Sequence, residues 1–194
     1  MADARHIIPF IFYWEDGVPA KYLDRPFPEL FGKAKERGLV IIEDDAGGAT
    51  VCGVTYDTYR TYKRKKGLPE PTVEELVTMS PDEWLDVFKT LFWNRIGGEG
   101  IVNQAVADMI VDWAWTSGVP YVAKRVQKVV GAKRDGIIGP KTLALINGRN
   151  SACLLEGLRL ERIDYYEAIV RAKPKNRKFL QGWINRTNSC AKWK

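Results

Sequence analysis

The fold is decided by the stretch Ile7-Ile8-Pro9-Phe10-Ile11-Phe12-Tyr13-Trp14-Glu15-Asp16-Gly17. Pro9 suits the first turn of a helix, where its missing N–H does no harm, and Gly17 is typical of a helix end. We therefore expect a buried helix with Glu15 in its last turn. Because apolar neighbours disfavour the charged form of a carboxyl group, Glu15 is expected to be hard to ionise. A glutamate kept protonated near neutral pH can act as the general acid in glycoside hydrolysis.

A small β-hairpin is predicted next to this helix. The β-branched run Leu39-Val40-Ile41-Ile42 is typical of a strand, and the segment from Thr50 to Val54 is expected to return as its partner. Gly47 and Gly48 supply the turn and let a sugar approach the backbone closely. Residues 18–38, which contain three prolines and end in a short helical pattern, precede the hairpin.

Carboxylates and hydroxyls accompany this hairpin and could assist Glu15. Thr55 is also expected to cap a helix that carries Tyr56, Tyr59 and Tyr62, a stripe that favours packing over sugar binding. The candidate assisting residues are Asp44, Asp45, Thr50 and Thr55.

The rest of the chain has helical periodicity. Two capping boxes, Thr72 with Glu75 and Ser80 with Glu83, begin consecutive helices, and Pro174 ends a long helix from about residue 151. The run Gly97-Gly98-Glu99-Gly100 is the best candidate for an internal boundary. We predict a mainly α (α+β) fold with a small hairpin, divided into regions 1–96 and 97–194 that pack as one compact unit.

Composition limits the classes of function. The chain has 194 residues, a hydrophobic fraction of 45%, three cysteines, one histidine and a net charge of +6. An odd number of cysteines without metal-ligand spacing argues against a disulfide framework, and His6 alone supports neither a His-based zinc site nor a catalytic triad. No metal and no cofactor are expected.

The sequence also bears on location and partners. No apolar run reaches the roughly 20 residues that span a bilayer, and the run after Ile7 lacks the features of a signal peptide. We expect a monomer made in the cytoplasm that does not insert into membranes. A basic nucleic-acid-binding protein is an alternative that rests only on charge.

The residues resemble a known family. Glu15-Asp16-Gly17, Asp45-Ala46-Gly47-Gly48-Ala49-Thr50 and Gly53-Val54-Thr55 are similar to the Glu-Gly-Gly, Asp-Pro-Gly-Gly-Ala-Thr and Gly-Ile-Thr series of the glycoside hydrolase family 108 muramidases. These are lysozyme-like enzymes, some of them called secretion activator proteins. One departure is Asp16, which stands where the family has glycine.

The resemblance continues through the second half. The segment Phe92-Trp93-Asn94-Arg95 is similar to the end of the family's hydrolase region, and Asp112 occupies the place of the aspartate in Asp-Phe-Ala-Val-Asn-Ser-Gly, with Thr116 in place of the asparagine. The stretch from Val126 to Thr142 resembles the family's predicted peptidoglycan-binding region, and the segment Phe179 to Arg186 matches its Phe-Leu-x-Gly-Trp-x-Asn-Arg. The predicted substrate-binding residues are Gly47, Gly48, Trp93, Asp112, Gln127 and Asp135.

What the resemblance implies is a lysozyme-like fold and hydrolysis of the β-1,4 bond between N-acetylmuramic acid and N-acetylglucosamine, with peptidoglycan glycan strands as partner and no nucleic acid. Glu15 would be the general acid. Asp44 or Asp45 could position or activate the water, and Thr50 or Thr55 could hydrogen-bond it. Both aspartates stay open. Asp108 and Asp112, four apart on a helix, are interpreted as a salt-bridged or solvated pair.

An alternative within the same fold is a peptidoglycan-binding or secretion-regulating protein with weak or no catalysis. For the enzyme, we expect action at the cell wall or periplasm after release from the cytoplasm, either as a prophage endolysin passing a membrane pore or through a dedicated exporter.

Overall fold

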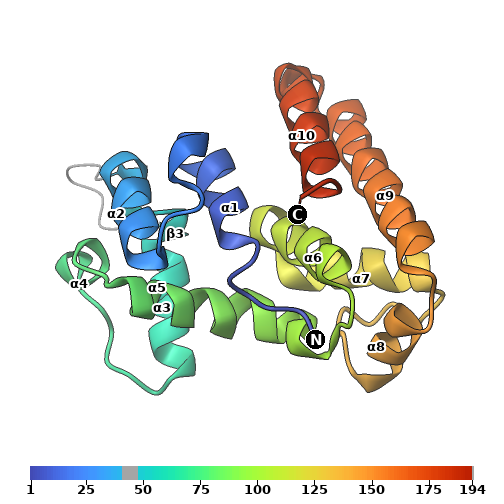
Figure 1. Ribbon diagram of the computed structural model, residues 1–194, viewed down its shortest axis with the longest axis horizontal. Helices are drawn as coiled ribbons and strands as arrows, with labels where there is room; N and C mark the ends of the chain where they lie inside the picture. The colour runs from blue at the N-terminus through green and yellow to red at the C-terminus, as the bar shows by residue number, and fades with distance from the viewer. Residues whose placement is uncertain (41–47, 194) are drawn as a thin grey trace. The chain divides into compact units, whose positions relative to one another are not determined.

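The computed structural model describes residues 1–40 and 48–193 (Figure 1). Helices make up most of these residues, and a small antiparallel sheet of order β1-β2-β3 accompanies them, which confirms the predicted fold class. Among the described residues, no helix is long and apolar enough to cross a membrane.

Contacts between residues divide the chain into two units. The N-terminal unit is Ile7–Leu91, and the C-terminal unit combines Met1–His6 with Phe92–Lys194. The first six residues join the C-terminal unit because the Ala2 amide donates to the Ile101 carbonyl (3.0 Å). The predicted domain boundary after residue 96, and the packing of both regions as one unit, stay predictions.

The first helix forms as predicted. Helix α1 (Ile8–Glu15) has Pro9 in its first turn and buries Ile8, Phe10, Ile11 and Phe12. Its end is closed by the amides of Asp16 and Val18, which both donate to the Phe12 carbonyl (3.1 and 3.2 Å). The helical pattern at the end of residues 18–38 is also confirmed, as α2 (Phe27–Gly38).

The sheet corrects one prediction. Strands β1 (Leu39–Val40) and β2 (Thr50–Val51) pair antiparallel, as expected, but the segment from Thr50 to Val54 is not one strand. It turns at Cys52 and Gly53 and returns as β3 (Val54–Thr55). Both turn residues have positive φ, +47° and +75°, which is the geometry of a two-residue type I′ hairpin. Cysteine is an unusual residue for such a turn, so this turn could not be predicted from its residue type.

Trp84 organises the core of the N-terminal unit. Its fully buried indole meets Phe12 of α1 edge-on (centroids 4.8 Å apart) and stacks on Phe88 (5.6 Å). Its Nε1 donates to the carbonyl of Cys52 in the hairpin turn (3.1 Å). Trp84 thus holds α1 and the hairpin to one core. Its replacement by alanine would lower the free energy of unfolding by about 3–5 kcal/mol.

The capping predictions have mixed outcomes. Thr55 caps its helix by accepting from the Thr58 amide (3.2 Å), and the Thr72 capping box is complete. Ser80 accepts from the Glu83 amide (3.2 Å), but the Glu83 carboxylate accepts from the Tyr59 hydroxyl (2.6 Å) rather than closing a box. The remaining elements of this unit are η1 (Ala20–Tyr22), α3 (Tyr56–Lys65), α4 (Val73–Val77) and α5 (Pro81–Phe88).

The C-terminal unit is built of helices. Helix α6 packs against α7, α9 and α10, and α9 lies beside α10 (Figure 1). A π-helical segment, η3 (Lys89–Trp93), leads into this unit from α5. The helices are α6 (Gln104–Ser117), α7 (Val119–Val130), α8 (Pro140–Asn147), α9 (Ser151–Ala172) and α10 (Arg177–Cys190), joined by the short 3-10 turns η4 (Asn94–Ile96), η5 (Gly98–Gly100) and η6 (Pro174–Asn176).

Candidate functional site

Glu15 ends α1, as the sequence predicted, but its surroundings differ from the expectation. The side chains before it at Ile11 and Phe12 are buried, whereas Glu15 itself is exposed. The prediction that apolar side chains enclose Glu15 is therefore wrong, because the last turn of α1 directs this residue away from the core. Its role as an acid stays a prediction.

The hydroxyl candidates lie across the β2–β3 hairpin from each other. Thr50 and Thr55 are direct partners in the register of the two strands. The Thr55 hydroxyl lies 2.9 Å from the Thr58 hydroxyl and accepts from the Thr58 amide, so it already serves as a helix cap. Thr50 is half-buried and, unlike Thr55, does not serve as the cap of α3.

The structure describes only some of the other predicted site residues of this region. Asp44, Asp45 and Gly47 lie outside the described residues, and the choice between the two aspartates stays open. Gly48 is half-buried.

Asp16, the departure from the family pattern, packs against the backbone of Gly38. A Cβ built on Gly38 would overlap the Asp16 carboxyl group. Gly38 ends α2 and leads into β1, so Asp16 occupies space that only a glycine leaves open. This contact places the Asp16 side chain at the α2–β1 junction.

The predicted substrate-binding residues of the second half are mostly buried. Trp93 is 0% exposed and its ring packs on Gly98, and Asp112 and Gln127 are 0% and 1% exposed. Other parts of the protein cover these three side chains, and their role in substrate binding stays a prediction. Asp135 is exposed.

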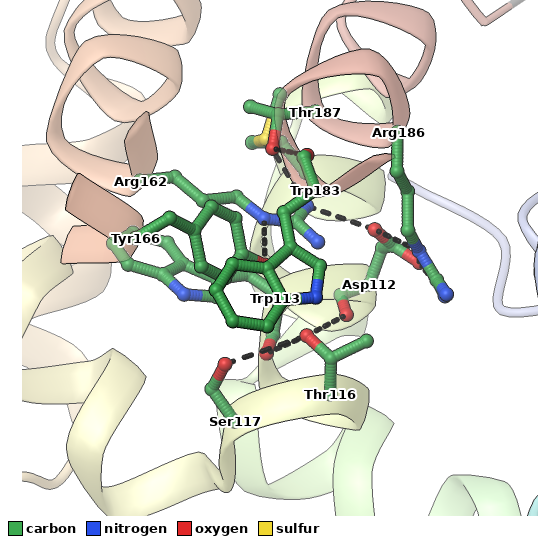
Figure 2. Close-up of polar contacts among 10 residues, drawn as sticks. Asp112, Trp113, Thr116, Ser117, Arg162, Tyr166, Trp183, Arg186 and Thr187 are labelled. Carbon is green, nitrogen blue, oxygen red and sulfur yellow. Dashed lines mark hydrogen bonds and ion pairs between the residues drawn. The ribbon is translucent and has the colours of Figure 1, made fainter. Parts of the chain in front are cut away.

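Asp112 lies at the centre of a buried ion cluster (Figure 2). Arg162 of α9 donates from Nη1 to its Oδ2 (2.8 Å), and Arg186 of α10 donates from Nη2 to its Oδ1 (2.7 Å). Burial opposes ionisation of Asp112, but the guanidinium groups of Arg186 and Arg162 outweigh it and hold its pKa below the usual range. The interpretation of this aspartate as salt-bridged is confirmed, and the cluster ties α6, α9 and α10 together.

Asp108, one turn earlier on α6, holds the N-terminal segment. Its Oδ2 lies 2.7 Å from His6 Nδ1, and its Oδ1 accepts from Gln104 Nε2 (2.8 Å). Burial raises the pKa of Asp108 to about 6, even though Gln104 and His6 favour its charged form. The Trp193 indole donates to the His6 carbonyl (3.1 Å), so both chain ends meet here.

Gln127 shapes the turn that precedes α8. Its Nε2 donates to Asp135 Oδ1 (2.7 Å) and the Ile137 carbonyl (3.0 Å), and its Oε1 accepts from the Gly136 amide (2.9 Å). The bonds from Gln127 and the Ile137 amide lower the pKa of the Asp135 carboxyl group. Gln127 therefore acts on the conformation of this turn.

Arg162 is a buried partner of Asp112 that was not predicted from the sequence. It is 0% exposed and also donates from Nε to the Tyr166 hydroxyl (3.0 Å). A signal was present, because residue 162 continues the four-residue spacing of the buried positions Leu154, Leu158 and Tyr166. A charged residue on such a face requires a buried partner of opposite charge.

The fold is that of a mainly helical, lysozyme-like class of protein with a small antiparallel sheet. Residues 33–118 match the family described as Glycosyl hydrolase 108, and residues 122–188 match the family described as Predicted Peptidoglycan domain. One part of the chain is thus similar to the glycosyl hydrolase 108 family and another to the predicted peptidoglycan domain, which confirms the resemblance. The first match begins after Glu15.

A solved structure is similar over nearly the whole chain. The structure titled "Structure of Brucella abortus SagA" shares 27% sequence identity and a TM-score of 0.65, covering 89% of this chain and 91% of that chain. No curated protein matches. The two family matches together support a peptidoglycan hydrolase, an enzyme of the glycoside hydrolase class, with peptidoglycan as its partner.

Proposed function

We propose that this chain hydrolyses the β-1,4 bond between N-acetylmuramic acid and N-acetylglucosamine, with Glu15 as the general acid. The observation that carries the proposal is the placement of Glu15 at an exposed helix end whose helix shares a core with the hairpin. The contact of Phe12 with Trp84 and the bond from Trp84 to the Cys52 carbonyl hold these two elements together.

Glu15 would donate its proton to the leaving glycosidic oxygen. A bound glycan strand would exclude water from the surroundings of this carboxyl group. The oxocarbenium-like centre then requires a water or a second carboxylate. Asp44 and Asp45 are both candidates for that step, and Thr50 is better placed than Thr55 to hydrogen-bond the water, because Thr55 caps α3.

The test is clearing of purified peptidoglycan, with reducing ends counted, by the intact chain and by Glu15→Gln between pH 5 and 8. We expect the substitution to lower the rate at least 100-fold, since general-acid catalysis contributes about 10²–10⁴-fold. Glu29→Gln, at an exposed glutamate of α2, is the matched control and should retain activity. Glu15→Gln that clears as fast as the intact chain would remove Glu15 from the mechanism.

A chain that clears no wall type would overturn the hydrolase assignment and favour the binding or regulatory alternative.

As for location, we propose that the protein acts at the cell wall after release from the cytoplasm. Fractionation of the producing cells tests this, because the proposal fails if the protein never reaches the wall fraction before or during lysis.

A further inference from the structure

A row of aromatic rings crosses the C-terminal unit from α7 over α9 to α10. Successive centroids are 4.9 Å apart for Tyr121 and Tyr165, 5.2 Å for Tyr165 and Tyr166, 5.1 Å for Tyr166 and Trp183, and 5.9 Å for Trp183 and Phe179. Tyr166 is buried, but Tyr121 and Phe179 at the two ends are 40% and 48% exposed, and Tyr165 and Trp183 are partly exposed. We name the four accessible rings the aromatic row.

A basic pocket adjoins one end of the aromatic row. It is lined by Tyr121, Lys124, Arg125, Lys128 and Arg134. Two of these residues pair with one carboxylate, because Glu161 binds both Arg125 (2.8 Å) and Lys128 (2.6 Å). Among the described residues, Lys124 and Arg134 have no ion pair, so the pocket keeps an excess of positive charge. A pocket of this kind fits an anionic group.

The row and the pocket are joined through Arg125. Its guanidinium donates from Nε and Nη2 to the Tyr121 hydroxyl (3.2 and 2.7 Å) and lies 5.3 and 5.7 Å from the ring centroids of Tyr121 and Tyr165. These contacts hold both rings in place before any ligand arrives, which reduces the ordering cost of binding.

Packing of α7 does not require a tyrosine at residue 121 or a cation at residue 124, whereas Arg125 and Lys128 also pair with the buried Glu161. Tyr121, Lys124, Arg125 and Lys128 follow the i, i+3, i+4, i+7 spacing of one helix face, and α7 buries its opposite face, Val122, Ala123 and Val126 among others. Exposed aromatic rings beside uncompensated cations are typical of binding surfaces.

We propose that the aromatic row and the basic pocket form one surface that binds uncleaved peptidoglycan, a reading that rests on the proposed function for its substrate class. The apolar faces of sugar rings stack on Tyr121, Tyr165, Trp183 and Phe179. The carboxylates of a stem peptide, which branches from the glycan strand, bind Lys124 and Arg134. This surface replaces the buried residues Trp93, Asp112 and Gln127 as the contact of the C-terminal unit with the wall.

Binding is measured with the full chain carrying Glu15→Gln, on purified sacculi and on glycan strands freed of stem peptides by an amidase. Tyr121→Ala with Phe179→Ala should weaken binding about tenfold or more on both materials, since each loses an exposed stacking ring. Lys124→Glu with Arg134→Glu should weaken binding to sacculi by a similar factor and leave binding to peptide-free strands unchanged. Circular dichroism of each variant checks that it is folded.

The controls match the variants in chemistry. Lys141→Glu with Lys173→Glu repeats the charge change at exposed positions of the same unit, and Leu145→Ala with Leu160→Ala removes two exposed apolar side chains. Both should bind as the parent does. Unchanged binding by the aromatic variant would overturn the stacking surface, and an equal loss by the charge variant on both materials would overturn the stem-peptide assignment.

These outcomes are separate from the test of the hydrolase. Wall binding that depends on the row and the pocket, by a chain that clears no wall, would keep this surface and refute the enzyme. Clearing that depends on Glu15, together with unchanged binding by both variants, would support the enzyme and refute this surface.

Discussion

The carboxylate of Asp112 accepts a hydrogen bond from Arg162 Nη1 at 2.8 Å, and both side chains are 0% exposed. The two residues lie 50 positions apart in the chain, so this bond fixes α9 on α6. A buried carboxylate held in this way supports the fold of the C-terminal unit.

Replacement of Asp112 by asparagine should destabilise the protein strongly. It would leave the guanidinium groups of Arg162 and Arg186 without their buried counter-charge, and breaking a buried ion pair on one side typically costs about 3–5 kcal/mol. Urea unfolding followed by circular dichroism measures the change. Asp164→Asn, at an exposed position of α9, should stay within about 0.5 kcal/mol of the intact chain. A stable Asp112→Asn variant with weakened wall binding would restore the original substrate-binding prediction.

Asp108 should make the stability of the C-terminal unit fall as pH rises. Its pKa is about 6 in the folded protein against 3.8 for the free group, so between these values the folded state binds more protons than the unfolded state. The unfolding free energy then decreases from about pH 4 to pH 6, by on the order of 3 kcal/mol for a shift of about two pKa units. Comparison of the intact chain with Asp108→Asn over this range should show a difference that changes with pH, and a constant difference contradicts the assignment.

Gln127→Ala should loosen the turn before α8. The substitution removes the donor to Asp135 and the Ile137 carbonyl and leaves the buried Gly136 amide without its acceptor, at a cost of about 1–3 kcal/mol. Hydrogen exchange is the direct measurement, because the Gly136 amide should exchange faster. Gln181→Ala, at an exposed position of α10, is the control. Protection of Gly136 that survives Gln127→Ala would show that the turn is held by other contacts.

Asp16 and Gly38 should be energetically coupled. Gly38→Ala introduces a Cβ into the space of the Asp16 carboxyl group, and Asp16→Gly, which restores the residue of the family pattern, removes the overlap. A double-mutant cycle in urea should therefore give a coupling energy of about 0.5–3 kcal/mol, with Gly38→Ala better tolerated when residue 16 is glycine. Additive effects of the two substitutions would mean that Asp16 moves away freely.

The features that depend on neighbours along the chain could be predicted from sequence patterns. The bounds of α1 follow from Pro9 and Gly17, the start of α3 from the Thr55 cap, and the length of α9 from its periodicity and Pro174. The fold class and the two family regions follow from these patterns together with motifs. Each of these interactions lies within a few residues, so a local pattern is enough to predict it.

Tertiary structure decided the partners of the polar groups. Asp112 is bound by Arg186 from 74 positions away, and the carbonyl of Cys52 in the hairpin turn accepts a hydrogen bond from the Trp84 indole, 32 positions away. Burial of Trp93 and Gln127, and the succession of ring contacts from Tyr121 to Phe179, likewise depend on how distant helices pack. A sequence pattern places a residue on a face of its own helix, but it does not state which other helix covers that face, and that contact decides whether the residue stabilises the fold or can bind a ligand.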